Sequence, residues 1–214
     1  MVLKLEKAIA EKRMTFRGLS WQAYKQIGNA LGSSTRARLT YDNGTLEILM
    51  PLELHEFSRM MFERFIFAIA VELGLRIKTM GSTTLDREDL LKAVEPDNAY
   101  YFQNQALVAG RDININQDPP PDLVIEIDIT HTDIQKLSLY ASLGVPEFWR
   151  YNGQILRIYK LDNKLEKEYV EVEVSPTFSQ VPKSKLYQFL VESKQDEIDA
   201  ELSLRKWIRE IRKD

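Results

Sequence analysis

The sequence contains no cysteine and only two histidines, His55 and His131, among its 214 residues. The absence of cysteine excludes disulfide bonds, thiolate catalysis, zinc fingers and iron–sulfur clusters. Two histidines are too few for a catalytic zinc site with three histidine ligands. A long hydrophobic run is also missing, because two acids and an arginine interrupt the most apolar stretch, residues 60–75. That stretch is too short and too charged to span a bilayer, so we expect no membrane partner.

The first residues also lack the pattern of a secretory signal. Residues 1–13 alternate apolar and charged side chains, without an apolar run that leads to small residues. We therefore expect a soluble, cytoplasmic protein. Hydrophobic residues make up 44% of the chain and charged residues 29%, which is ordinary for a folded domain with its own core. The formal net charge of −3 counts mildly against a sequence-independent DNA-binding protein, because such proteins are usually basic.

Turn and capping signals predict a mixed α/β domain. Two Asn-Gly pairs between alternating residues predict an N-terminal and a C-terminal β-hairpin, around residues 43–44 and 152–153. Hydrophobic periodicity and glycine stops predict helices at 21–32, 53–73, 133–143, 184–191 and 194–214, the last one amphipathic. Further strands are expected at 75–80, 97–102, 122–130 and 169–174, whereas 83–94 is ambiguous and 103–121 reads as a polar linker. The pattern indicates a sheet of hairpins and parallel pieces between helices.

The segment Asp122–Thr130 is the first that suggests chemistry. Alternate residues of a strand point to opposite faces, so one face here is aliphatic and the other carries three carboxylates, those of Asp122, Glu126 and Asp128. Glu126 and Asp128 lie roughly 7 Å apart on that face and repel each other unless a cation or a proton lies between them. The alternative is an antiparallel strand with one face in water, which needs no function.

Four other residues could complete such a site. Asp97 follows Pro96 and enters a strand, although a turn residue in this place is common. Glu56 begins the most apolar helix, where an acid is also favoured by the helix dipole. Lys136 shares a helix face with Leu139 and Tyr140, and its stem could equally extend along that face to solvent. His131 lies in the turn between the strand and this helix, where histidines are usually exposed.

Together, the acids and the lysine suggest a metal site. Carboxylate oxygens are hard ligands that suit Mg²⁺ or Mn²⁺. A cation held by them could lower the pKa of a water molecule and stabilise charge on a phosphoryl oxygen. A nearby lysine could position that water or offset negative charge in the transition state. Crowded acids also repel, so replacing one is expected to leave folding intact or improved.

The order of these motifs resembles the PD-(D/E)xK nuclease superfamily. The chain is most similar to a large bacterial family of restriction-endonuclease-like proteins, first catalogued as a domain of unknown function. Three segments carry this resemblance: Pro121–Ile127, Lys136–Ala141 and Gly144–Arg150. The likeness extends from about Leu19 through the C-terminal helix. It implies a restriction-endonuclease-like domain at 19–192, preceded by an extension at 1–18 and followed by a helix at 193–214.

The resemblance assigns roles to particular residues. Asp97 matches the metal-binding aspartate of the Pro-Asp motif, Glu126 matches the acid of the (D/E)xK half, and Glu56 matches the acid on the first core helix. The chain departs from the motif at Asp128, where a lysine is expected. In this family the lysine comes from the next helix, which fits Lys136. Asp128 and His131 remain possible accessory residues.

These roles imply a divalent-metal-dependent endonuclease that hydrolyses DNA phosphodiester bonds. The substituted lysine and the net charge favour a second hypothesis, a non-catalytic binding or regulatory module with the nuclease fold. A third hypothesis is a hydrolase of small phosphoesters, because the low net charge suits a small substrate better than it suits DNA. The amphipathic C-terminal helix and an exposed hairpin edge suggest a homodimer.

Overall fold

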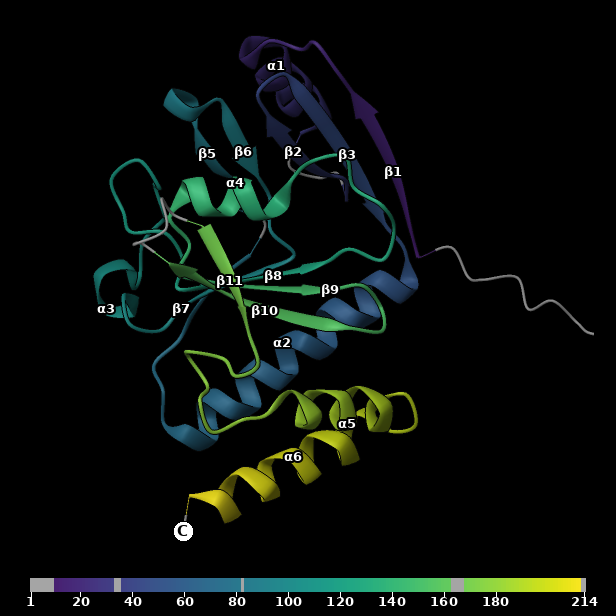
Figure 1. The fold of residues 1–214 in the computed structure, drawn as a ribbon, viewed down its shortest axis with the longest axis vertical. Coiled ribbons are helices and arrows are strands. Elements are labelled where there is room, and N and C mark those ends of the chain that lie inside the picture. The colour runs from purple at the N-terminus through teal and green to yellow at the C-terminus, as the bar shows by residue number, and fades with distance from the viewer. Residues whose placement is uncertain (1–9, 33–35, 82, 163–167, 213–214) are drawn as a thin grey trace, which may run out of the picture.

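A computed structural model of the protein describes residues 10–32, 36–81, 83–162 and 168–212. In this part of the chain, strands form two sheets and helices cover them (Figure 1). The predicted mixed α/β fold, with helices on the sheet and two β-hairpins, is confirmed. The hairpins, however, belong to different sheets and do not share one sheet as expected. This difference matters, because the candidate site lies where the two sheets approach each other.

The central sheet is mixed. Its order is β11-β10-β9-β8-β7-β4, and only the β8–β9 pair is parallel among the pairs described. The connection between these two strands carries a helix, as a parallel crossover requires. The strands are β4 (Lys78–Met80), β7 (Asn98–Tyr101), β8 (Leu123–Ile127), β9 (Glu147–Tyr151), β10 (Leu156–Asp162) and β11 (Glu168–Val172).

Helices cover both faces of the central sheet. The helices are α1 (Trp21–Leu31), α2 (Glu53–Leu73), α3 (Gln105–Val108), α4 (Lys136–Leu143), α5 (Lys183–Ser193) and α6 (Glu197–Ile211). Figure 1 shows α4 on one side of the sheet and α2, α5 and α6 on the other. The aliphatic face of β8, including Ile125 and Ile127, packs into the core formed with α2, α5 and α6. The opposite face packs through Val124 against the Tyr140 side of α4.

The carboxylate face of β8 is therefore not a wet face. Glu126 is 1% exposed and Asp128 is 3% exposed, so α4 and its neighbours exclude water from both. Because a bare buried charge costs several kcal/mol, both acids need cations or donors from the protein. The alternative of a strand with one solvated face is wrong for this segment.

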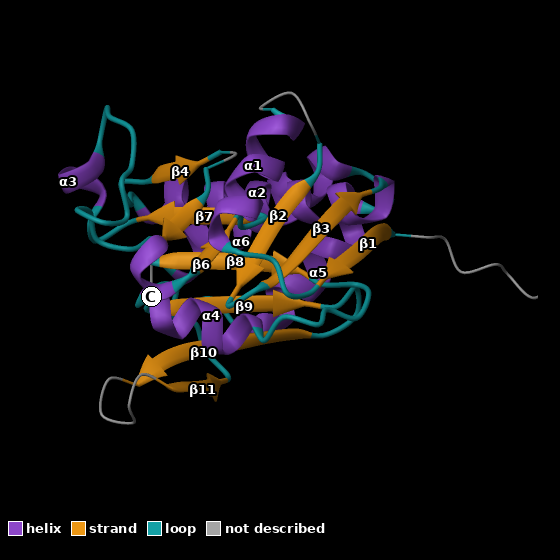
Figure 2. Cartoon of the chain, turned by 90° about the horizontal axis from the view of Figure 1, so that it is seen from above, coloured by secondary structure: helices purple, strands orange, loops and turns teal. Residues whose placement is uncertain are grey.

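The second sheet is antiparallel and carries the N-terminal hairpin (Figure 2). Its order is β1-β3-β2-β6-β5, and α1 packs on it through Trp21 and Tyr24. The turn Asn43-Gly44 has positive φ at both residues, 45° and 91°, which is the geometry that favours Asn-Gly in hairpins. The strands are β1 (Glu11–Phe16), β2 (Arg38–Asp42), β3 (Thr45–Pro51), β5 (Leu85–Arg87) and β6 (Lys92–Val94), and the short 3₁₀ helix η1 (Glu88–Leu90) joins the last two.

The predicted helix boundaries agree closely with the structure where a cap was recognised. The Ser20 hydroxyl accepts a hydrogen bond from the amide of Ala23 at the start of α1, and Gly74 ends α2 in the left-handed conformation. Other segments differ from the prediction. The polar linker contains α3, the ambiguous segment contains β5, η1 and β6, and the N-terminal extension contributes β1. Residues 1–9 of that extension lie outside the described residues, and the predicted domain division stays a prediction.

The C-terminal helix packs on α2 through both apolar and charged contacts. Ala200, Leu204 and Ile208 are buried in the core, and Arg209 donates two hydrogen bonds of 2.7 Å to the carboxylate of Glu72. Within the described residues, no helix is long and apolar enough to cross a membrane.

Candidate functional site

Asp97 and Glu126 lie side by side at the end of two neighbouring strands. The antiparallel register pairs Asn98, the first residue of β7, with Ile125, and this register continued by one residue puts Asp97 opposite Glu126. Side chains at directly opposed positions lie on the same face, with Cβ atoms about 5 Å apart. The Asp97 carboxylate also accepts a hydrogen bond from the Ile127 amide, with 2.7 Å between Oδ2 and nitrogen. The Pro-Asp acid and the acid of β8 are thus adjacent, on neighbouring strands.

Glu126 is held from the other side by α4. The Lys136 ammonium lies 2.8 Å from Oε2 of Glu126, and the Tyr140 hydroxyl donates to Oε1. Residues four apart on a helix share a face, so the first and fifth residues of α4 can reach the same carboxylate. Burial alone would lower the pKa of Lys136, but Glu126 and Asp128 raise it above its ordinary value. Lys136 is therefore an ammonium cation at neutral pH, and the structure brings it to the acid of β8.

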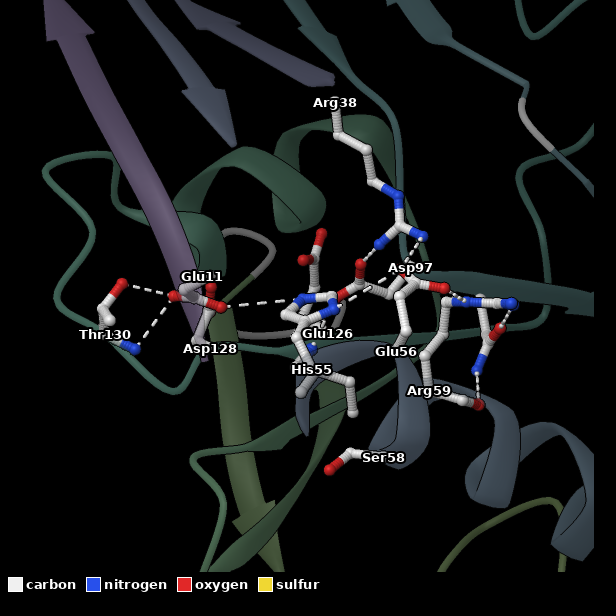
Figure 3. Close-up of polar contacts among 12 residues, drawn as sticks. Glu11, Arg38, His55, Glu56, Ser58, Arg59, Asp97, Glu126, Asp128 and Thr130 are labelled. Atoms are coloured by element: carbon white, nitrogen blue, oxygen red, sulfur yellow. Dashed lines mark hydrogen bonds and ion pairs between the residues drawn. The ribbon is translucent and has the colours of Figure 1, made fainter. Parts of the chain in front are cut away.

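Arg38 comes to this site from the second sheet. It is the first residue of β2, and its guanidinium pairs with Asp97 and with Glu56 (Figure 3). The Nη2 atom lies 3.2 Å from Oε1 of Glu56. Burial lowers the pKa of the guanidinium, whereas the charges of Glu56 and Glu126 oppose that effect. The sequence motifs do not indicate Arg38, because a lone arginine in a hairpin strand gives no sign of which carboxylates it contacts in the fold.

Glu56 is the most accessible of the three predicted metal acids. Its side chain is 35% exposed and pairs with Arg38 and with Arg59, whose Nε lies 2.9 Å from Oε2. Contact with His55, and then hydrogen bonding to Arg59 and the charge of Arg38, lower the pKa of Glu56 to about 2 in spite of partial burial. Glu56 is therefore an anion throughout the physiological pH range.

His55 connects three acids in the interior. Its side chain is fully buried, and Nε2 lies 3.4 Å from Oδ2 of Asp97 and 3.7 Å from Oε2 of Glu11, while Nδ1 lies 3.7 Å from Oε1 of Glu56. In Figure 3 the ring lies between Glu11 and Asp97. The sequence showed this histidine only as the neighbour of Glu56. Its place at the start of an apolar helix was the available signal that it would be buried among the acids.

Asp128 belongs to a separate ion-pair network. Arg13 lies 3.2 Å from its Oδ1 and Arg150 lies 3.0 Å from its Oδ2. Burial raises the pKa of Asp128, but Lys136, Arg150 and Arg13 together lower it below its ordinary value. His131, the other accessory candidate, has an 89% exposed side chain and contacts Asp133 in its loop, at 3.6 Å. Asp128 therefore acts on the site through its negative charge, which helps to raise the pKa of Lys136. His131 lies in solvent.

A cleft of about 980 Å³ gives access to part of this arrangement. It is bounded by α1, the start of β2, the first turns of α2, and the strands β4 and β7. Arg38, Glu56, Arg59 and Asp97 line it, whereas the buried pair Glu126 and Lys136 is not among its lining residues. The cleft is large enough for several groups of a substrate. It opens onto Arg38 and Glu56, whereas the Asp97 side chain on its wall is only 1% exposed and is paired with Arg38.

The carboxylates of this region determine whether a divalent cation can bind there. Among residues 10–32, 36–81, 83–162 and 168–212, no group of three or more histidine, aspartate or glutamate side chains is arranged to hold a metal ion. Mg²⁺, however, is commonly bound by one or two carboxylates, with water and phosphate oxygens as the other ligands. The opposed pair Asp97 and Glu126 supplies two such hard oxygen donors. The residues present therefore fit an ion of the Mg²⁺ or Mn²⁺ type. One of the two donors, the carboxylate of Asp97, is paired with Arg38 in this structure.

The comparison with protein families agrees with this architecture. The Uma2 family, described as "putative restriction endonuclease", matches residues 21–192. That range covers most of the chain, including both sheets except β1, and the chain belongs to this family. A search of the curated proteins gave no match.

Proposed function

We propose that this protein is a divalent-metal-dependent endonuclease that hydrolyses DNA phosphodiester bonds. The observation that carries the proposal is the opposed pair Asp97 and Glu126, with Lys136 bound to Glu126, in a chain of a nuclease-like family. Membership of that family supports nuclease chemistry, and the geometry supports the residues that we assign to it. Magnesium or manganese, DNA and a second copy of the chain are the proposed partners.

Each residue has a role that its surroundings support. Asp97 and Glu126 would hold the cation, and Glu56 would complete its shell directly or through water. When bound, such an ion lowers the pKa of a water molecule and stabilises charge on a phosphoryl oxygen. Lys136 keeps its proton, because two acids raise its pKa, so it stabilises negative charge and positions Glu126 rather than removing a proton. Asp128 supports this role of Lys136, because its negative charge helps to raise the pKa of the lysine.

The test is cleavage of supercoiled plasmid DNA by the purified chain with Mg²⁺ or Mn²⁺. We expect nicked or linear product that requires the metal and is lost in Asp97→Asn and in Glu126→Gln. Both substitutions keep the shape of the side chain while removing its charge. Cleavage that survives either substitution would contradict the proposal. A melting experiment with the same proteins provides a readout apart from activity, because a bound ion stabilises the folded state by mass action.

One observation favours a second candidate function, a non-catalytic module with the nuclease fold. Each buried acid of the region already has a cation from the protein: Arg38 for Asp97, Lys136 for Glu126, and Arg13 and Arg150 for Asp128. If neither metal raises the melting temperature at millimolar concentration, this second function is favoured. A small phosphodiester offered beside plasmid DNA distinguishes the endonuclease from a hydrolase of small phosphoesters.

A further inference from the structure

Arg38 contacts two of the proposed metal acids and is close to the third. Its guanidinium pairs with Asp97 and lies 3.2 Å from Glu56, and the charge of Glu126 acts on it as well. The side chain is 19% exposed and lines the 980 Å³ cleft. Figure 3 shows the guanidinium between the Asp97 and Glu56 carboxylates. One arginine thus lies between the cleft and the acids.

The two oxygens of Asp97 are used differently. Oδ2 accepts the Ile127 amide at 2.7 Å, which fixes the carboxylate against the end of β8. Oδ1 faces the Nη1 atom of Arg38. A divalent ion shared by Asp97 and Glu126 would need a free lone pair on Asp97, and Oδ1 is the oxygen that the backbone does not already use. The ion and the guanidinium therefore compete for one oxygen atom.

We propose that Arg38 is a displaceable internal counter-ion, which releases Asp97 to a divalent cation and then binds a phosphate of the DNA in the cleft. This inference rests on the proposed function. A guanidinium suits both positions, because its planar set of N–H donors matches carboxylate and phosphate equally well. Its location on the cleft wall means that a change of rotamer is enough to move it from the acid towards a substrate.

The charges in the site agree with this exchange. Four acids, Asp97, Glu126, Glu56 and Glu63, contact three protein cations, Arg38, Arg59 and Lys136. This set carries one net negative charge, and a divalent ion alone would change it to one net positive charge in a partly buried place. The doubly negative phosphorane of phosphodiester hydrolysis would return it to one net negative charge. The set therefore carries the same net charge without metal and substrate as in the transition state with both.

The test is calorimetric titration of the full chain with Mn²⁺. Removing the competing cation in Arg38→Gln should tighten Mn²⁺ binding by a factor within the range of about 5–150 that is typical of coupled binding. Arg59→Gln is the matched control, because Arg59 also pairs with Glu56 and lines the same cleft but is not paired with Asp97. We expect its effect on Mn²⁺ affinity to be much smaller. Equal or weaker Mn²⁺ binding by Arg38→Gln would overturn the inference, because an arginine that merely positions Asp97 would have that effect.

A second measurement tests the phosphate-binding position. Affinity for a fluorescent duplex should fall in Arg38→Gln when Ca²⁺ is present, and should change little in EDTA, where the guanidinium stays on Asp97. A loss of the same size under both conditions would overturn the inference. If Arg38→Gln fails to fold, Arg38→Lys serves instead, since an ammonium lacks the planar fork of a guanidinium, should hold Asp97 less firmly and should therefore also tighten Mn²⁺ binding.

The outcomes separate this inference from the proposed function. If the native chain binds Mn²⁺ and cleaves DNA but Arg38→Gln binds the ion no better, only the inference fails. If the native chain does not bind Mn²⁺ and Arg38→Gln does, the arginine excludes the ion without being displaced by it, and the inference fails. If neither protein binds Mn²⁺ and the native chain does not cleave DNA, the proposed function fails and the inference fails with it.

Discussion

Glu126 is a buried anion whose two oxygens are both used by the protein. Lys136 lies 2.8 Å from one oxygen, and the Tyr140 hydroxyl donates to the other. The sequence alone suggested that removing an acid would relieve repulsion and leave folding intact or improved. The structure leads to the opposite expectation for a substitution that changes the shape of the side chain. Protein cations such as Lys136 already offset the repulsion between the acids, so removing an acid leaves a buried cation without its partner. Breaking a buried pair by removing one partner costs about 3–5 kcal/mol, since the other charge remains buried.

We therefore predict that Lys136→Met lowers the free energy of unfolding by about 3–5 kcal/mol, because it leaves the buried carboxyl group of Glu126 without its cation. The double variant Glu126→Met with Lys136→Met should recover most of that loss, since no unpaired charge remains. Urea denaturation of the two single variants and the double variant measures the coupling. If the effects of the two single substitutions simply add up in the double variant, Glu126 and Lys136 do not stabilise each other, and the prediction is wrong.

The site residues differ in how well the sequence predicts them. Asp97, Glu126 and Lys136 could be selected because the resemblance marks their positions and the strand pattern puts Glu126 on a face of carboxylates. Arg38 and Glu11 could not, because their partners depend on how the second sheet packs against β8. That packing depends on contacts between residues more than fifty positions apart in the sequence, such as Arg13 with Asp128. Local hydrophobic periodicity does not predict such contacts.

At the scale of the element, β1 joins the N-terminal sheet to the end of β8. Arg13 of β1 pairs with Glu47 of β3 and with Asp128, while Glu11 of β1 accepts a 2.9 Å hydrogen bond from the Thr130 amide. These contacts cross from one sheet to the other in a buried place. Asp128, at the position where the resemblance predicts a lysine, thus contributes to the junction between the sheets.

This junction predicts a pH dependence. Because Lys136, Arg150 and Arg13 hold the pKa of Asp128 below its ordinary value of 3.8, its contribution to stability is present above that pH and is lost as the pH falls through the lower folded value. Arg13→Met should raise the folded pKa of Asp128, so acid unfolding should begin at a higher pH than in the native chain. At neutral pH we expect a loss of about 3–5 kcal/mol, as for other broken buried pairs.

Circular dichroism during acid titration measures the first effect, and urea denaturation at neutral pH measures the second. Arg17→Met is the matched control, because Arg17 follows the same strand and pairs with Asp133, but its side chain is 68% exposed. An exposed pair is worth about 0–1 kcal/mol, so the control should unfold near the native pH. The same acid midpoint for Arg13→Met and Arg17→Met would contradict the role given to Arg13.

Elements with local signals were predicted well from the sequence. A side-chain cap marks the start of α1, left-handed glycines mark the ends of α2 and α4, and an Asn-Gly turn marks each hairpin. The strands β1, β5 and β6 and the short helix α3 were missed. β5 and β6 are only three residues long and β1 lies at a sheet edge, so their pairing partners rather than their own periodicity decide that they form.

For the molecule as a whole, the sign of its charge limits how it can bind DNA. The net charge is −3, and the cleft is lined by four bases and five acids: Lys25, Arg36, Arg38 and Arg59 against Glu53, Glu56, Glu63, Glu95 and Asp97. A polyanion gains little from such a surface. A divalent cation would reverse the balance in the cleft, so the net charge argues for metal-dependent binding rather than against DNA as the substrate.

We therefore predict weak duplex binding in EDTA and clearly tighter binding with Ca²⁺, measured by fluorescence anisotropy between 50 and 200 mM salt. Contacts with roughly three phosphates would give a slope of log affinity against log salt of about −3 or shallower. The small slope follows because Arg38 and Arg59 are shared with acids, which leaves few cations free to replace counterions on the DNA. Tight binding without metal and a much steeper slope would mean that DNA is recognised by a basic surface outside this cleft.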